Sequence, residues 1–156
     1  MPEESRMTSD KIIVRCAACR TLNNVPAEKL KARPLCGQCK AGLSVPHAPV
    51  DGTGATFDRE FGDWPEAVLV EFWAKWCGYC RMVEPVVNEL ADWRAGTLKI
   101  IRIDIDAEPA LAKRFKVHAT PTFILFRKGD QVARMDGAPK EKIELVQWVD
   151  HHLPRP

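Results

Sequence analysis

The stretch that decides the fold reads EFWAKWCGYCR, from Glu71 to Arg81. It continues an apolar run that begins at Val68 and favours a buried β-strand, and it ends in the first turn of an amphipathic helix. Its two cysteines, Cys77 and Cys80, therefore lie where a strand gives way to a helix. A thiol in that position faces unpaired backbone N–H groups and the positive end of the helix dipole, and both favour the thiolate. The pattern predicts a pair of thiols that cycles with a disulfide.

The sequence on both sides of this junction predicts alternating helices and strands. Hydrophobic periodicity and turn residues predict helices over about residues 56–61, 78–95, 108–115 and 140–152. They predict strands over about residues 66–73, 98–103, 122–126 and 131–135, the last two joined by a hairpin turn at 127–130. This order predicts an α/β domain with a mixed central sheet and helices on both faces.

The other four cysteines form two further Cys-x-x-Cys pairs near the N-terminus, Cys16 with Cys19 and Cys36 with Cys39. Their spacing, C-x2-C-x16-C-x2-C, is typical of a zinc ribbon. In such a site each pair forms a tight turn, here called a knuckle, and two knuckles surround one Zn2+ ion with four thiolates. Four sulfur ligands leave no open coordination position, so we expect one structural zinc ion.

Two alternatives for these cysteines are ordinary buried thiols and disulfides. Two pairs at this spacing argue against the first, and a reducing compartment argues against the second. The segment 11–45, here called the ribbon, has few apolar residues, and a unit this small usually needs a metal or disulfides to fold. His47 is a conceivable extra ligand, but four thiolates already satisfy zinc, and we expect a solvent-facing linker histidine.

Charge and composition divide the chain into unequal parts. Residues 11–49 hold seven basic residues and one acidic residue, a net charge of +6, whereas the chain as a whole carries +2. A segment rich in proline and glycine follows the ribbon. We therefore predict a flexible tail over residues 1–10, the ribbon over 11–45, a linker over 46–54 and a second domain over 55–156.

From residue 55 to about residue 153 the sequence resembles the thioredoxin family. The resemblance rests on Trp73-Ala74-Lys75-Trp76-Cys77-Gly78-Tyr79-Cys80, on Pro85 in the following helix, on Thr120-Pro121-Thr122 before the hairpin and on Gly137-Ala138 before the last helix. With the two knuckles in front, the whole chain resembles the zinc-binding bacterial members of that family. It departs from the family at Tyr79, where proline is typical, and at Glu71, where aspartate is typical.

The resemblance implies a protein-disulfide reductase, with electrons supplied by a thioredoxin reductase. Cys77 is then the exposed nucleophile and Cys80 the more buried resolving thiol. Glu71 is a buried carboxyl that relays a proton to or from Cys80; the alternative is a solvent-facing carboxylate at a strand edge. The resemblance also implies a cis peptide bond before Pro121. The expected substrate-binding rim comprises Trp76, Gly78, Tyr79, Thr120, Pro121 and Gly137.

Two other functions stay open at this point. Because Tyr79 replaces a rigid proline, the pair could be a more oxidising disulfide exchanger or an isomerase, with a potential above the roughly −270 mV of thioredoxin. Because the ribbon keeps a charge of about +4 once four thiolates and zinc contribute −2, it could be a docking module. Residues 11–45 contain no aromatic residue to stack on bases, so we expect a protein partner rather than a nucleic acid.

The ends and hydropathy of the chain suggest a location. Residues 1–10 are polar, and we expect no signal peptide. No apolar run approaches the roughly 20 residues of a membrane helix. We therefore expect a cytoplasmic protein that does not associate with membranes.

Overall fold

A computed structural model describes residues 11–62, 64 and 66–154, so the predicted tail over residues 1–10 lies outside the described residues. The ribbon begins with two strands and a short 3-10 helix: β1 (Lys11–Arg15), β2 (Leu22–Pro26) and η1 (Ala27–Ala32). The remaining elements are β3 (Val50–Asp51), α2 (Phe57–Gly62), β4 (Ala67–Trp73), α3 (Gly78–Trp93), β5 (Leu98–Asp104), α4 (Pro109–Arg114), β6 (Thr122–Arg127), β7 (Asp130–Asp136) and α5 (Ile143–His152).

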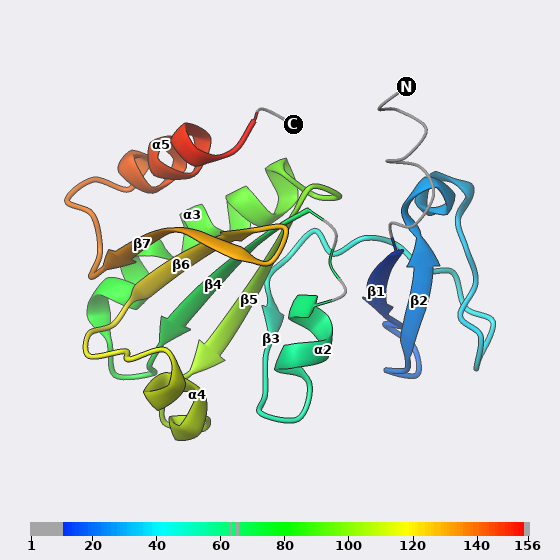
Figure 1. The fold of residues 1–156 in the computed structure, drawn as a ribbon, viewed down its shortest axis with the longest axis horizontal. Coiled ribbons are helices and arrows are strands. Elements are labelled where there is room, and N and C mark those ends of the chain that lie inside the picture. The colour runs from blue at the N-terminus through cyan, green and yellow to red at the C-terminus, as the bar shows by residue number, and fades with distance from the viewer. Residues whose placement is uncertain (1–10, 63, 65, 155–156) are drawn as a thin grey trace.

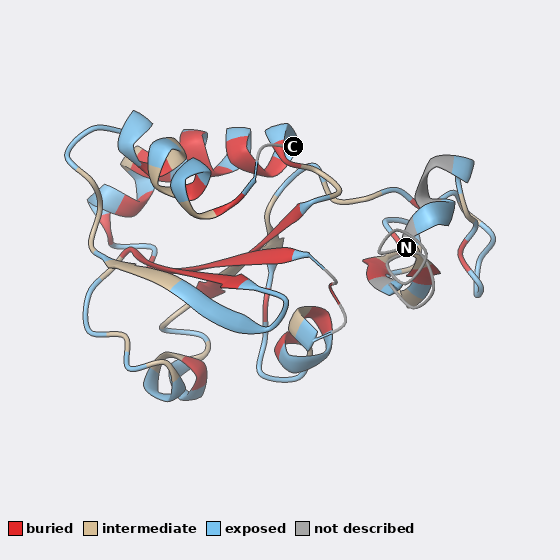
Figure 2. Ribbon diagram, turned by 45° about the horizontal axis from the view of Figure 1, so that its top comes forward, coloured by how far each residue is buried: buried red, intermediate tan, exposed pale blue. Residues whose placement is uncertain are grey.

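The five later strands form one mixed sheet in the order β3-β5-β4-β6-β7 (Figure 1). Strands β3, β5 and β4 run parallel, whereas β6 and β7 are antiparallel to their neighbours. Helices α3 and α5 cover one face of this sheet, and α2 and α4 cover the other (Figure 2). This confirms the predicted α/β architecture of a mixed sheet between two helical layers.

Strand β4 is the centre of the fold because both of its faces are buried. Val70 and Phe72 pack toward α2 and α4 with Phe57 and Leu111, whereas Leu69 packs toward α3. Successive side chains of a strand point to opposite faces, so the unbroken apolar run suits a strand covered on both sides. The same alternation places Glu71 on the face that α3 covers.

The segment predicted as a linker contains a strand that sequence analysis did not predict. Val50 and Asp51 pair with Ile101 and Arg102 of β5, and the next residue, Gly52, donates its N–H to the Arg102 carbonyl at 2.8 Å. A Cβ atom at Gly52 would lie only 2.6 Å from Ile101 Cγ2. This glycine therefore marks a close approach of backbone to the sheet rather than a loose connection.

A buried carboxylate, Glu60, joins the ribbon to the main sheet. Glu60 and Lys99 are each 2% exposed, and their charged atoms lie 3.9 Å apart. Arg15, at the end of β1, approaches the same carboxylate at 3.7 Å and donates to the Arg20 carbonyl at 2.9 Å. Buried charges are tolerated when they are paired, so this cluster ties α2 and β5 to the ribbon beside Cys16.

Within the described part of the chain, we find no helix of sufficient length and apolar character to cross a membrane.

Candidate active site and metal centre

The strand–helix junction places the Cys77 thiol at the N-cap of α3. Cys77 has an extended backbone (φ −86°, ψ 111°), and its sulfur accepts the backbone N–H of Cys80 at 3.1 Å. An N-cap side chain normally satisfies one of the orphan N–H groups in the first helical turn, and here a thiol does so. The same sulfur lies 3.4 Å from the Thr120 carbonyl oxygen, to which the thiol donates. The junction therefore joins α3 to the loop before β6.

The expectation that Cys77 is exposed is wrong. Cys77 is 4% exposed and Cys80 is 2% exposed, so both thiols are buried. They pack with Ala74, Trp73 and Ile105, and the Thr120 carbonyl lies against the Cys77 sulfur. Chain position alone suggested an open helix end, but the loop before β6 folds against that end and shields the sulfur.

The pKa values of the two thiols shift in opposite directions. Burial raises the pKa of Cys77, but hydrogen bonds with the Cys80 and Thr120 side chains and with the backbone N–H groups of Cys80 and Tyr79 outweigh burial and lower it. Burial and the neighbouring Cys77 raise the pKa of Cys80 to about 12, and the negative charge of Glu71 adds to that rise. The thiolate is therefore favoured on Cys77 over Cys80, and Cys80 keeps its proton at neutral pH.

The carboxyl group of Glu71 is fully buried in β4. The Arg102 Nε donates to its Oε1 at 2.9 Å, while its Oε2 is buried with no hydrogen-bond partner. Burial raises the pKa of Glu71 to about 7, although the charge and hydrogen bond of Arg102 oppose that rise. Glu71 is therefore buried inside the sheet, and the alternative of a solvent-facing carboxylate is wrong.

Arg102 is a residue of this site that sequence analysis did not connect with Glu71. The two residues are direct neighbours in the parallel pair of β4 and β5. The Arg102 guanidinium also lies 4.4 Å from the centroid of the Trp73 ring and 3.4 Å from the Glu84 carboxylate. The sequence does show a basic residue within an apolar strand. It does not show that this residue pairs with Glu71, because that depends on the register between β4 and β5.

The expected rim residues lie on three segments around Cys77. The Thr120–Pro121 peptide bond is cis, and the Pro121 carbonyl accepts the N–H of Gly137 at 2.8 Å, where Gly137 adopts a φ of +93°. Trp76 is 65% exposed and donates its indole N–H to Asp106 at 2.9 Å. The remaining members, Gly78 and Tyr79, are exposed at the start of α3.

The two N-terminal cysteine pairs form knuckles of the same design. In the first, Cys16 N–H donates to the Thr21 carbonyl at 2.9 Å and Arg20 N–H donates to the Cys16 carbonyl at 2.9 Å. In the second, the corresponding bonds join Cys36 to Ala41 at 2.8 Å and Lys40 to Cys36 at 3.0 Å. Arg20 and Lys40 both adopt positive φ, 70° and 66°, so each knuckle ends in a left-handed residue.

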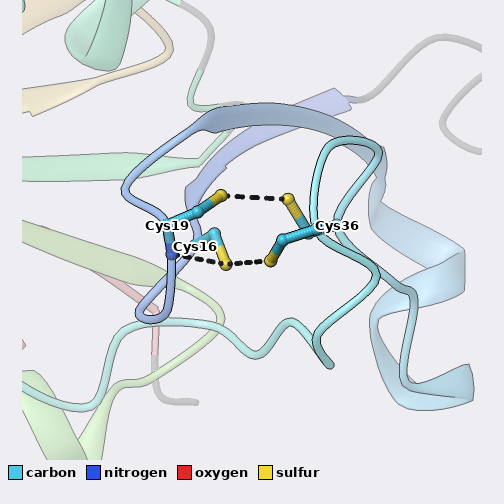
Figure 3. Close-up of side chains that lie close together, drawn as sticks. Cys16, Cys19 and Cys36 are labelled. Atoms are coloured by element: carbon cyan, nitrogen blue, oxygen red, sulfur yellow. Dashed lines mark hydrogen bonds between the residues drawn. The ribbon is translucent and has the colours of Figure 1, made fainter.

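The knuckles bring four sulfur atoms together (Figure 3). The four ligand atoms lie within 4.8 Å of one another, and the cross-knuckle distances Cys16–Cys39 and Cys19–Cys36 are both 3.6 Å. Tetrahedral zinc with Zn–S bonds of about 2.3 Å requires sulfur atoms about 3.8 Å apart. The donor set therefore fits the ion that the spacing predicted.

His47 lies elsewhere, exposed and 2.8 Å from Asp92 of α3.

The acidities of these thiols also suit a cation. A backbone hydrogen bond from Cys39 leads the interactions that lower the pKa of Cys36 to about 6, against the opposing effect of burial. Cys39 has a hydrogen bond from Ala41 that lowers its pKa, but its cysteine neighbours and burial raise it to about 11. Hydrogen bonds with the neighbouring cysteines and burial thus hold the proton on Cys39. A metal binds the thiolate and replaces that proton, so metal binding and proton release are linked.

Two polar residues at this centre were missed by sequence analysis. Asn23 of β2 contacts the second knuckle through Gly37 and Cys36, and the Thr21 hydroxyl lies 3.2 Å from the Cys19 sulfur. Both residue types are ordinary in turns and strands, so nothing in their composition marked them. A weak signal was their position immediately after the first cysteine pair.

Comparison with known proteins gives a consistent result. The family model described as Thioredoxin matches residues 48–151, and the one described as Thioredoxin 2, N-terminal, a zinc ribbon, matches residues 15–41. Thioredoxin C-3 of Corynebacterium nephridii is 37% identical over 142 residues, which cover 91% of this chain and 96% of that protein.

Two further relatives match about two thirds of the chain. A bifunctional thioredoxin reductase/thioredoxin of Mycobacterium leprae is 38% identical over 105 residues, 67% of this chain and 23% of that protein. A solved structure of a mutant thioredoxin from Halobacterium salinarum NRC-1 superposes with a TM-score of 0.62 at 33% identity. That alignment covers 70% of this chain and 94% of the other.

The raised pKa of Glu71 predicts a pH-dependent stability. Folded Glu71 keeps its proton up to about pH 7, whereas its ordinary pKa is 4.5. The folded state therefore binds more protons than the unfolded state between these values, and stability falls as the pH rises through that window. The total loss should be about 3 kcal/mol, at 1.36 kcal/mol per pKa unit.

Urea unfolding of the reduced protein at pH values from 4 to 7.5 measures this loss. Glu71→Gln should abolish that part of the slope, because glutamine does not titrate. Glu84→Gln, which removes an exposed carboxylate that also contacts Arg102, should keep most of it, because the Glu84 charge is the smallest of the contributions to the Glu71 pKa. Parallel pH profiles for the wild-type protein and Glu71→Gln would show that the folded protein does not hold this proton.

Proposed function

We propose that this chain, which belongs to the thioredoxin family, reduces disulfide bonds in proteins through Cys77 and Cys80. As a thiol–disulfide oxidoreductase it exchanges two thiols for one disulfide. The observation that carries the proposal is the hydrogen bond from Cys80 N–H to the Cys77 sulfur at 3.1 Å, together with the opposite pKa shifts of the two thiols. This arrangement provides a nucleophile and a protonated resolving thiol one helical turn apart.

The reaction takes place in two exchange steps. The Cys77 thiolate attacks one sulfur of the substrate disulfide, forms a mixed disulfide and releases the other sulfur as a thiolate. Cys80 then loses its proton and attacks the Cys77 sulfur. This step forms the Cys77–Cys80 disulfide and releases the second substrate thiol. The substrate gains two electrons and two protons in total, one proton from Cys80 and one taken up from water by the substrate thiolate released first.

A thioredoxin reductase is the electron donor that we infer for the return step. The Mycobacterium leprae relative carries both names, reductase and thioredoxin, for a single protein. We infer that such a reductase reduces the Cys77–Cys80 disulfide of the present chain. We also infer that the reaction takes place in the cytoplasm, where such a donor keeps thiols reduced.

A substrate would approach over the rim formed by Trp76, Gly78, Tyr79, Thr120, Pro121 and Gly137. Trp76 and Tyr79 are 65% and 66% exposed, so they offer apolar surface next to a buried sulfur. Because the Thr120 carbonyl lies 3.4 Å from the Cys77 sulfur, a substrate sulfur would come close to this loop. Since Cys77 is buried, the rim has to open slightly or the attacked disulfide has to protrude.

Glu71 would accept the Cys80 proton during resolution. Its pKa of about 7 suits a group that gains and loses a proton near neutral pH, and its charge contributes to the raised pKa of Cys80. Its unpartnered Oε2 offers an acceptor for the proton, directly or through water. Arg102 holds the other oxygen and so orients the group.

Four thiolates, Cys16, Cys19, Cys36 and Cys39, would hold one structural Zn2+ ion. A complete sulfur shell leaves no position for substrate or water, so the metal would contribute folding energy rather than catalysis.

The centre could also respond to redox conditions. Oxidation of the four thiolates by two disulfide oxidants would form two disulfides, release the ion and reduce both oxidants.

We also propose the domain division given by the sequence, with the ribbon at 11–45, the linker at 46–54 and the thioredoxin domain at 55–156. Its support is the separation of the β1–β2 hairpin from the five-stranded sheet. Within the proposed linker, residues 50 and 51 pair with β5 and so add an edge strand to that sheet.

A second candidate function, a more oxidising exchanger or isomerase, is favoured by one observation at Tyr79. Its backbone N–H is among the groups that lower the pKa of Cys77, and a proline there would have no N–H to offer. Support for the thiolate stabilises the reduced form of the pair, which raises the redox potential. We therefore expect a potential nearer to −200 to −230 mV than to about −270 mV.

Replacement of the resolving thiol tests the exchange mechanism. Cys80→Ser should react once with a disulfide-bonded protein and accumulate as a mixed disulfide, because no second thiol releases it. Cys77→Ser is the matched control and should form no such adduct. Mass spectrometry after trapping with acid measures both. Adducts on Cys80 in the Cys77→Ser variant, with none on Cys77 in Cys80→Ser, would reverse the assigned roles.

The role of Glu71 predicts a pH-dependent resolution step. Glu71→Gln should slow resolution about 10- to 100-fold at pH 7, because a positioned general base typically contributes that much or more. The deficit should shrink toward pH 9, where hydroxide removes the Cys80 proton. Single-turnover kinetics from pH 6 to 9 follow the decay of the mixed disulfide. Equal rates for the wild-type protein and Glu71→Gln across that range would exclude a relay.

The effect of Tyr79 can be measured as a redox potential. Tyr79→Pro should lower the potential of the Cys77–Cys80 pair by about 40 to 70 mV, toward that of thioredoxin. Tyr79→Ala keeps the backbone N–H and should retain most of the wild-type value. Equilibration in glutathione buffers gives all three potentials. A wild-type potential at or below about −270 mV would reject the oxidising candidate and leave the reductase.

A further inference from the structure

Asn23 links the two knuckles from a position outside the four cysteines. It lies on β2, opposite Val14 in the hairpin register, and is partly buried. Its Oδ1 accepts the backbone N–H of Gly37 at 2.9 Å, and Gly37 is the first residue inside the second knuckle. Its Nδ2 donates to the Thr21 carbonyl at 3.1 Å, directly after the first knuckle. One amide therefore spans from the end of the first knuckle to the start of the second.

The same Nδ2 lies 3.5 Å from the Cys36 sulfur and 3.5 Å from the Val14 carbonyl. An amide nitrogen carries two protons, so one is available for Thr21 while the other points toward Cys36 and Val14. Cys36 is fully buried, and its sulfur also receives the Gln38 N–H at 3.4 Å. A hydrogen bond to an ionised sulfur is stronger than one between neutral groups, because the acceptor carries the charge.

From these contacts we propose that Asn23 is the positioning residue of the metal centre, which orients the second knuckle and supports the Cys36 thiolate. The inference rests on the proposed zinc centre and extends it to a residue that neither the cysteine spacing nor the family resemblance indicates. The Gly37 contact sets the distance and angle between the knuckles. The Cys36 contact spreads part of the double negative charge of a four-thiolate zinc centre onto the protein.

The energetic reason lies in the size of the ribbon. Such a small unit has little apolar core to hold two loops in register, and residues 23 and 37 lie 14 positions apart in the chain. The Asn23 side chain holds the two knuckles together before the metal binds. Less conformational entropy is then lost when the metal orders the knuckles. Groups that hold a metal ligand typically change metal affinity 10- to 100-fold when they are removed.

Substitution of Asn23 with a residue of similar size tests the inference. Asn23→Leu removes every hydrogen bond of the amide, including those to Gly37 and Cys36, and should weaken zinc binding 10- to 100-fold in competition with a chromophoric chelator. The matched control is Asn24→Leu, because Asn24 is the next residue of β2 and is exposed. It should bind zinc within about threefold of the wild-type protein, in keeping with a surface substitution.

Asn23→Asp separates the two contacts. Its carboxylate still accepts the Gly37 N–H but cannot donate to Cys36 or to the Thr21 carbonyl, and it brings a negative charge to the thiolates. Affinity should therefore fall at least as far as in Asn23→Leu. In the Co2+-substituted proteins, loss of the donor should shift the sulfur-to-cobalt charge-transfer band to longer wavelength, because an unsupported thiolate releases electron density more readily.

These experiments distinguish failure of the Asn23 inference from failure of the proposed zinc centre. If the purified wild-type chain holds no zinc and takes up none, the zinc centre itself is rejected. If the wild-type chain holds one zinc and Asn23→Leu binds it within threefold of the wild type, only the role of Asn23 is rejected. If Asn23→Asp binds zinc as tightly as the wild type and its cobalt band is unshifted, Asn23 does not support the Cys36 thiolate. Its role would then be limited to the contact with Gly37.

Discussion

The hydrogen bond from Cys80 N–H to the Cys77 sulfur, 3.1 Å long, depends on three parts of the second domain, namely β4, α3 and the loop before β6. It requires β4 to end where α3 begins, so that Cys77 occupies the N-cap. It also requires the loop before β6 to close over the sulfur with the Thr120 carbonyl. Because these groups exclude water, the bond acts in a medium of low dielectric and has a larger effect on the thiolate than the same bond at the surface.

Low dielectric also explains why neighbouring groups in one site shift in opposite directions. Cys77 has several donors aimed at its charge, so its pKa falls despite burial. Cys80 and Glu71 are buried with less compensation, and their pKa values rise to about 12 and about 7. Arg102 prevents a larger rise at Glu71 by contributing one charge and one hydrogen bond. The differences in acidity that exchange chemistry needs thus come from the distribution of donors within one dry region.

The ribbon meets a different constraint, because its apolar core is small and includes only a few residues such as Ile13, Val14 and Val25. Its four cysteines provide a site for a metal, and the Gly37–Asn23 contact joins the loops that carry them. Arg15 then approaches the buried Glu60 of the thioredoxin domain and also contacts the Arg20 carbonyl at the end of the first knuckle. Residues within a few positions of the metal ligands therefore both order the ribbon and attach it to the larger domain.

The sequence by itself determined the mixed α/β architecture, the buried strand before Cys77, and the clustering of the four N-terminal cysteines. These features follow from periodicity and spacing, which are local properties. Only the tertiary structure decided that Cys77 is buried, that Glu71 pairs with Arg102, that residues 50–51 join the sheet, and that Asn23 bridges the knuckles. Each of these depends on the register between strands, or on a loop closing over a distant element. Neighbours along the chain cannot encode such contacts, because they arise from how separate elements pack in space.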